Sequence, residues 1–289
     1  MENFKFKKSF GQNFLNDKHI LENIVKESNI KNNSLVIEIG PGSGALTKYL
    51  SREAMQVLAY EIDSRLEDIL DENLAECHNV DIIFDDFLNR NIKDDIKNYV
   101  YDNIYVVANI PYYITTPIIL KLIESKINFN SITLMIQKEV GERFSAKVGS
   151  RDYSSITVFL NYFFDVKKLF VVSRNSFTPK PNVDSVVISL IKKDKNYFVS
   201  NEELFFKIVR DAFQFKRKNL RNNLKKYDLE KINEVLNKYH FDLTVRAEML
   251  TVDIFVEMAN ELDKGKWNNK FIIFLIKKHI IVWRWLYAF

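Results

Sequence analysis

Residues 35–45 read Leu-Val-Ile-Glu-Ile-Gly-Pro-Gly-Ser-Gly-Ala. The apolar start predicts a buried strand, Leu35–Ile39, and the final alanine opens a helical pattern. Between them, Gly40 and Gly42 let the backbone turn tightly and approach a ligand without side-chain obstruction. A strand, a glycine loop and a helix in this order indicate a site for a nucleotide-type ligand. The glycine spacing fits both NAD and S-adenosylmethionine, so the loop alone does not separate them.

Short apolar runs alternate with helical patterns over the first two-thirds of the chain, which is typical of a parallel sheet wound by helices. Seven strands, the last two arriving late, favour the Rossmann-like sheet of methyltransferases over a symmetric dinucleotide fold. We therefore expect the α/β fold class. The expected strands are Leu35–Ile39, Val57–Glu61, Asp81–Phe84, Ile104–Ala108, Ile132–Ile136, Thr157–Phe163 and Ser185–Ile191. The expected helices are Ile20–Glu27, Ala45–Arg52, Leu66–Glu76, Pro117–Glu124 and Lys138–Lys147.

Acidic residues end the second and third predicted strands, at the edge where open α/β sheets bind their ligands. Glu61 stands 21 residues after Gly40, where a carboxylate accepts hydrogen bonds from both hydroxyls of a ribose. Asp85 and Asp86 follow the third strand. One of them is expected to accept a hydrogen bond from the amino group of an adenine, and the other to cap a helix or face solvent.

Asn109-Ile110-Pro111-Tyr112 comes directly after the apolar run Ile104–Ala108. The exocyclic amine of adenine is a poor nucleophile because its lone pair is delocalised into the ring. The Asn109 side-chain oxygen and a backbone carbonyl held rigid by Pro111 can bind both amine hydrogens and draw the lone pair out of conjugation. Tyr112 offers a flat face to an unstacked base. Taken alone, the same tetrapeptide also fits a strand that ends in a proline turn.

The composition limits the classes of protein to which the chain can belong. At 289 residues, with 47% hydrophobic and 28% charged residues, it is typical of a globular protein with a real core. Cys77 is the only cysteine, so no internal disulfide is possible and a reducing, cytoplasmic setting fits. Residues 1–8 lack the apolar region of a secretion signal, and no run of about 18 apolar residues predicts a membrane span. The four histidines lack partners at ligand spacing, so we expect no metal.

The net charge of +4 is unevenly distributed. Residues 207–226 hold eight basic residues and a single acid, Asp211, so this segment alone carries +7. Such a patch predicts a polyanionic partner. Within it, residues 216–226 are expected to form a helix on which Arg217 and Arg221 line a basic stripe, although a solvated charged face would look the same.

Three parts are expected along the chain. Residues 1–195 form the ligand-binding domain with an N-terminal arm. Apolar residues recur at helical spacing from 201 to 262 without further strand signals, which predicts a small all-helical domain. The tail, 263–289, is apolar but broken by charges, which favours a docked helix over a membrane anchor.

The chain resembles the ribosomal RNA adenine dimethyltransferases over about residues 5–260, and within them the small-subunit enzymes that modify two adjacent adenosines near the end of 16S rRNA. Each supporting segment is short, but together they stand in the order and spacing of the family. The segments are Lys8–Leu15, Glu38–Gly44, Asn109–Tyr112 with its continuation to Pro117, Phe177–Ser185, Arg217–Leu224 and Arg246–Leu250. The tail from about residue 264 has no counterpart in the family pattern.

The resemblance implies S-adenosylmethionine as the cofactor and assigns roles position by position. The cofactor would be bound by Asn13 and Leu15 of the arm and by Gly40, Gly42, Glu61, Asp86 and Asn109. Catalysis would rest on Asn109 and Tyr112. A flipped adenine would lie between Tyr112 and Phe177, although composition alone places Phe177 in the core. Arg217 and Arg221 would bind the rRNA.

The expected activity is transfer of methyl groups to the N6 amines of small-subunit rRNA in a ribosomal particle, by a cytoplasmic monomer. Three alternatives remain open. A large-subunit rRNA adenine methylase of the macrolide-resistance type shares the cofactor motifs. An NAD-dependent oxidoreductase is allowed by the glycine loop but lacks an acid or base for hydride transfer. A ribosome-assembly factor would bind RNA without catalysis.

Overall fold

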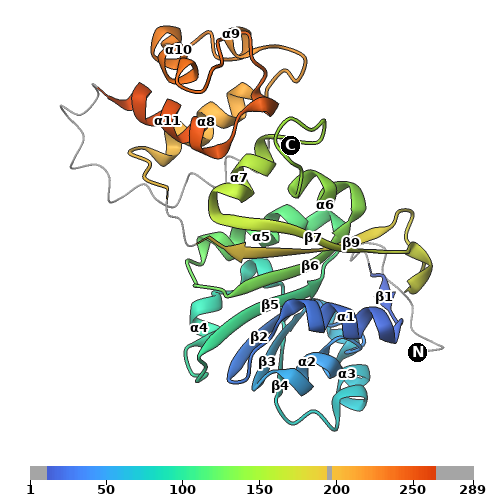
Figure 1. The fold of residues 1–289 in the computed structure, drawn as a ribbon. Helices are drawn as coiled ribbons and strands as arrows, with labels where there is room; N and C mark the ends of the chain where they lie inside the picture. The colour runs from blue at the N-terminus through green and yellow to red at the C-terminus, as the bar shows by residue number, and fades with distance from the viewer. Residues whose placement is uncertain (1–11, 194–196, 265–289) are drawn as a thin grey trace. The chain divides into compact units, whose positions relative to one another are not determined.

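The structure is a computed structural model that describes residues 12–193 and 197–264 (Figure 1). Most of the tail predicted at 263–289 therefore lies outside the described residues. The chain divides into two compact units, one made of residues up to 141 with 166–192 and the other of 142–165 with the residues from 193 onward. The second unit thus includes a segment, 142–165, that the sequence-based division had placed in the first domain.

The first unit is built on a seven-stranded sheet, which confirms the predicted Rossmann-like α/β class (Figure 1). The strand order is β4-β3-β2-β5-β6-β9-β7. The first five are parallel to one another, and β9 runs antiparallel to β6. The strands are β2 (Ser34–Ile39), β3 (Gln56–Glu61), β4 (Val80–Phe84), β5 (Asn103–Asn109), β6 (Ser131–Gln137), β7 (Phe164–Val172) and β9 (Ser185–Lys192). The β2, β3, β4, β5, β6 and β9 strands were predicted at these places.

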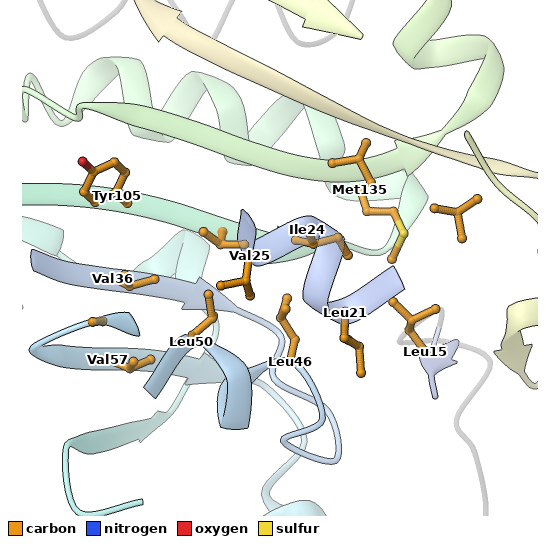
Figure 2. Close-up of a cluster of buried hydrophobic side chains, with 14 of the residues drawn as sticks. Leu15, Leu21, Ile24, Val25, Val36, Leu46, Leu50, Val57, Tyr105 and Met135 are labelled. Carbon is orange, nitrogen blue, oxygen red and sulfur yellow. The ribbon is translucent and has the colours of Figure 1, made fainter. Parts of the chain in front are cut away.

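Helices cover both faces of this sheet, because every residue of β2 is buried although successive side chains point to opposite faces. One core cluster joins Leu21, Ile24 and Val25 of α1 to Leu50 of α2 and to Val36 of β2 (Figure 2). The helices of this unit are α1 (Lys18–Ser28), α2 (Thr47–Glu53), α3 (Glu67–Leu74), α4 (Ile92–Ile96) and α5 (Thr115–Glu124), and α6 (Lys138–Phe144) continues into the second unit.

Two short strands form a second, two-stranded sheet. The β1 strand (Phe14–Leu15) pairs antiparallel with β8 (Phe177–Thr178), so that Leu15 lies opposite Phe177. This pairing joins the N-terminal arm to a segment more than 160 residues further along the chain. Two of the segments that carried the family resemblance therefore meet.

The strand predicted at Thr157–Phe163 is wrong, because α7 (Ser155–Phe163) is a helix. Its aromatic and β-branched residues favour strands, and all of Ser155–Leu160 is buried, so no polar face reveals the helical period. The decisive local signal is a capping box. The backbone N–H of Ser154 donates to the Thr157 hydroxyl at 3.1 Å, and the two side-chain oxygens lie 3.1 Å apart. The seventh strand of the sheet is β7, which begins directly after this helix.

The second unit is helical in its described residues, as the pattern after residue 201 predicts. An aromatic cluster forms part of its core, in which Phe159 and Tyr162 of α7 contact Phe206 of α8. Its helices are α7, α8 (Glu202–Ala212), α9 (Leu220–Asn223), α10 (Leu229–Asn237) and α11 (Val252–Asp263). Over both described ranges, 12–193 and 197–264, the helices are too short or too polar to span a bilayer.

The continuous helix expected at 216–226 is also wrong. After α8 the chain turns, and only the four residues of α9 are helical. The backbone N–H groups of Leu220 and Arg221 donate to the carbonyls of Val245 and Leu243, and not to the carbonyls one helical turn earlier. The Asn223 side chain caps the end of α8 by donating to the carbonyl of Ala212 at 2.6 Å. Tertiary pairing therefore overrides the helical spacing of the apolar residues.

Candidate active site at the carboxyl edge of the sheet

The parallel strands deliver the predicted residues to one edge of the sheet. Glu61 and Asn109 are the last residues of β3 and β5, and Asp85 directly follows β4. Because β2 lies between β3 and β5, its glycine loop opens at the centre of this edge. A cavity there is lined by the arm residues 12–15 and by Glu38, Gly40, Gly42, Glu61, Asp85, Asp86, Asn109 and Tyr112. The structure thus brings together the residues predicted to bind the cofactor.

The N-terminal arm lies directly against the glycine loop. Gly42 has φ +59°, and a Cβ built on it would lie 2.8 Å from a ring carbon of Phe14. Only glycine therefore allows both the backbone conformation and the close approach of the aromatic ring. The arm is also held by Gln12, whose side-chain nitrogen donates to the Asp63 carboxylate at 2.8 Å. Sequence reasoning missed the contributions of Phe14 and Asp63.

The Glu61 carboxylate accepts hydrogen bonds from the backbone on both sides of it. One carboxylate oxygen accepts from the backbone N–H of Gly42 at 3.1 Å, and the other accepts from the N–H of Asp63 at 2.9 Å. Burial raises the pKa of this carboxyl group, while the two backbone donors lower it. The side chain is only 4% exposed, yet it lines the cavity. Glu61 therefore shapes the glycine loop while its carboxylate faces the cavity.

Glu38, the first residue of the glycine motif, is 1% exposed. Among the residues that the structure describes, its Oε2 atom has no hydrogen-bond partner. Burial raises the pKa of its carboxyl group to about 8. The Thr47 side chain lowers this pKa, and the nearby charge of Glu61 raises it further. Since an unpaired buried polar atom is costly, this atom in the cavity wall indicates that a bound polar ligand contributes a partner.

The two aspartates after β4 differ in their contacts. Asp86 caps the short helix η3 (Phe87–Asn89) by accepting from the N–H of Leu88 at 2.9 Å. Asp85 lies 3.4 Å from the guanidinium of Arg90. Both line the cavity, so either carboxylate can present an oxygen to an amino group. Asp86 as the adenine-binding residue remains a prediction.

Asn109 is oriented by the arm. Its side-chain nitrogen donates to the backbone carbonyl of Asn13 at 3.3 Å. Pro111 follows with φ −56° and ψ 135°, which ends β5 and turns the chain into the short helix η4 (Tyr112–Ile114). With its nitrogen directed at Asn13, the amide leaves its oxygen as the acceptor for a second group.

Tyr112 is half-buried, and its hydroxyl lies 2.8 Å from the hydroxyl of Ser185. Burial raises the pKa of the phenol, so it stays protonated at neutral pH. Ser185 ends the segment Phe177–Ser185 that supports the family resemblance, but its sequence context predicts no role for it.

Comparison with known proteins agrees with this geometry. The family model described as ribosomal RNA adenine dimethylase matches residues 3–264. The chain is 43% identical over 270 residues to a Staphylococcus aureus protein named ribosomal RNA small subunit methyltransferase A, covering 90% of this chain and 91% of that protein.

The chain belongs to the ribosomal RNA adenine dimethylase family. It is therefore an S-adenosylmethionine-dependent enzyme that methylates adenine in rRNA.

Solved structures resemble this family member in fold. A dimethyladenosine transferase from Plasmodium falciparum matches with a TM-score of 0.72 and 29% identity, over 85% of this chain and 95% of that one. The 23S rRNA methyltransferase ErmE matches with a TM-score of 0.70 and 26% identity, over 87% of this chain and 100% of that one.

The cavity of this dimethylase fits S-adenosylmethionine by the chemistry of its walls. Carboxylates suit hydroxyl and amino groups, the glycine loop exposes backbone, and the unpaired oxygen of Glu38 needs a polar partner. The described residues contain no group of three or more side chains suited to a metal ion.

Phe177, the residue predicted to stack on the target base, lies in the hydrophobic core and not in the cavity wall. Phe177 is 4% exposed and packs in the core cluster with Leu15 and Leu21, and the cavity lining does not include it. The structure therefore does not bring Phe177 to the site, in line with its composition-based assignment to the core. To stack on a base, the ring would have to leave this cluster.

The predicted rRNA-binding arginines lie in the second unit. Arg217 and Arg221 are exposed, one in the turn after α8 and the other in α9. The described neighbours Lys216, Lys218 and Lys225 are exposed too. The basic surface thus exists as a turn with a short helix.

Proposed function

We propose that this dimethylase converts two adjacent adenosines near the 3′ end of 16S rRNA to dimethyladenosine. The observation that carries the proposal is the 43% identity, over nine-tenths of both chains, to a protein named for the small subunit. The large-subunit alternative is supported by the fold match to ErmE at 26% identity. The fold match accounts for the shared scaffold, whereas the higher identity favours the small-subunit substrate.

We assign the cofactor to the cavity at the sheet edge. Asn13 and Leu15 would cover it, Gly40 and Gly42 would contact it through the backbone, and Glu61, Asp86 and Asn109 would bind its polar groups. When bound, S-adenosylmethionine supplies a methyl group on a positively charged sulfur. Because the arm already lies on the glycine loop, it would shield this side of the bound cofactor from water.

Asn109 is proposed to bind the target amine. Its oxygen and the carbonyl of Ile110 accept the two amine hydrogens, while its nitrogen stays directed at Asn13. Tyr112 offers its ring face to the adenine, which must leave its stack at a cost of a few kcal/mol. A general base is not needed before attack, since the methylated amine is acidic enough to lose its proton afterwards. Catalysis then rests on positioning and on exclusion of water.

The exposed basic surface around Arg217 and Arg221 is proposed to bind the rRNA backbone inside a ribosomal particle. Its charge supports a polyanionic partner, and backbone contacts position an RNA without reading its sequence. We further propose that the enzyme acts as a monomer in the cytoplasm, in keeping with its single cysteine.

The direct test is transfer of tritiated methyl groups from S-adenosylmethionine to small-subunit particles that lack the modification. We expect incorporation at two adjacent adenosines, and none with large-subunit particles. The variant N109A serves as the control for contaminating activity. Incorporation into the large subunit would support the ErmE-like alternative, and RNA binding without incorporation would support an assembly factor.

A further inference from the structure

The tyrosine proposed to hold the target base is fixed at both of its ends. Its hydroxyl lies 2.8 Å from the Ser185 hydroxyl, and its backbone carbonyl accepts from the Thr115 hydroxyl at 3.2 Å. Thr115 is buried at the start of α5, and Ser185 is 0% exposed at the start of β9. Both partners are therefore rigid parts of the fold.

Sheet topology explains why Ser185 reaches this place. The β9 strand runs antiparallel to β6, and Ser185 pairs with Gln137, the last residue of β6. An antiparallel strand starts at the edge where its parallel neighbours end. The first residue of β9 therefore lies at the same carboxyl edge as Asn109, the last residue of β5.

We propose that Ser185 is a positioning residue that holds the ring of Tyr112 in the place required by the target adenine. The inference rests on the proposed function of Tyr112 as the platform for the base. A tyrosine ring turns about two side-chain bonds, and a base stacked on it follows the ring plane. The hydrogen bond to Ser185 fixes the position of the phenol oxygen and with it the direction of the ring axis. Because this oxygen lies on the axis about which the ring turns, the ring plane is restrained only by the preference of a phenol hydrogen bond to lie near that plane.

The consequence for the reaction is geometric. Asn109 and Tyr112 are three residues apart. The place of the Tyr112 ring therefore sets where a base lying flat on it presents its amine relative to the Asn109 oxygen. Small errors in the placement of reacting groups cost large factors in rate. Ser185 therefore acts on turnover through Tyr112 without touching the base itself.

The alternative is that the Ser185 hydroxyl merely satisfies a buried polar group, which is the usual situation in protein interiors. A double-mutant cycle with Y112F and S185A separates the two interpretations. Y112F removes one oxygen and leaves both the ring and the strand in place. S189A, which removes another buried hydroxyl from β9, is the matched control.

We expect Y112F and S185A each to lower kcat about threefold to tenfold, the range for loss of one hydrogen bond, and the double variant to lose no more than either single variant. The KM for unmodified small-subunit particles and the calorimetric Kd for S-adenosylmethionine should not change. S189A should leave kcat unchanged, and Y112A should reduce it further because it removes the platform.

Two results would overturn the inference. If Y112F matches the wild type, or if the two losses add in the double variant, Ser185 does not act through Tyr112. If Y112A also matches the wild type, the platform itself is wrong and the proposed function of Tyr112 fails with it. If S185A lowers the melting temperature more than S189A does, its loss of kcat could come from destabilisation. The kcat of Y112F then decides whether the hydrogen bond matters for turnover.

Discussion

The backbone carbonyl of Asn13 accepts the side-chain amide of Asn109 at 3.3 Å, across 96 positions of sequence. The contact links the arm that would cover the cofactor to the residue that would bind the target amine. It also distinguishes the two ends of the Asn109 amide, because the nitrogen donates to Asn13 and the oxygen is the end that can accept from a target amine.

N109A should abolish methyl transfer, and N109D should do nearly the same although it keeps an acceptor. The aspartate has no hydrogen to donate to Asn13, and its second oxygen would lie against that carbonyl. N103D, at the other end of β5, is the control. Single-turnover transfer to small-subunit particles measures the effect, and N109D activity within about tenfold of wild type would contradict the orientation inferred here.

E61A should raise the Kd for S-adenosylmethionine by about one to two orders of magnitude, because charge-assisted hydrogen bonds are worth about 1.5–3 kcal/mol each. The variant also deprives the Gly42 N–H of its acceptor, which loosens the glycine loop. E61Q keeps one acceptor oxygen and should weaken cofactor binding less than E61A does. E67A, which changes an exposed glutamate, should leave the Kd unchanged. Unchanged affinity in calorimetry would show that Glu61 does not bind the cofactor.

The fold and much of the candidate site could be predicted because they depend on local signals. Glu61 and Asn109 end parallel strands, so they lie at one edge of the sheet wherever the helices begin and end. The spacing of the glycines predicts the loop by itself. The errors came where tertiary contacts decide. The helix Ser155–Phe163, in which all of Ser155–Leu160 is buried, shows no amphipathic period. The backbone hydrogen bonds of Leu220 and Arg221 to Val245 and Leu243 prevent the continuous helix that the apolar spacing predicts.

Contacts between segments that are far apart in the chain could not be predicted from the sequence. The sequence does not reveal a partner for the Tyr112 hydroxyl. Ser185 reaches this hydroxyl because β9 pairs antiparallel with β6. The burial of Phe177 follows from its pairing with the arm, since Leu15 lies opposite it. Both depend on registers that a single sequence does not specify.

Phe177 should behave as a core residue. F177A should destabilise the protein by about 3–5 kcal/mol, the usual cost of truncating a buried phenylalanine. F177L fills most of the volume and should keep both the melting temperature and kcat close to wild type. If F177L folds normally but loses kcat by a factor of about 10 or more, the aromatic face is needed and the ring does reach the base, as the family resemblance implies.

R217A/R221A should weaken binding to small-subunit particles and flatten its dependence on salt by about one to two units of slope, because each phosphate contact releases counterions. The Kd for S-adenosylmethionine should not change. K93A/K97A, which removes Lys93 of α4 and Lys97 at its C-cap, is the control for net charge. The slope of log Kd against log salt is the measurement, and an unchanged slope would assign the two arginines to a solvated surface.

E38Q should remove a pH dependence of stability. In the folded protein the Glu38 carboxyl has a pKa of about 8, whereas a glutamate ordinarily has 4.5. Between these values the native state keeps a proton that the unfolded chain releases, so this group favours folding less and less as pH rises through that window, and its effect levels off above about pH 8. Glutamine is neutral throughout, so the stability of E38Q relative to wild type should increase from pH 5 to pH 8. Urea unfolding at several pH values measures this, with the exposed E53Q as control, and parallel curves for E38Q and wild type would show that Glu38 is ionised in the native state.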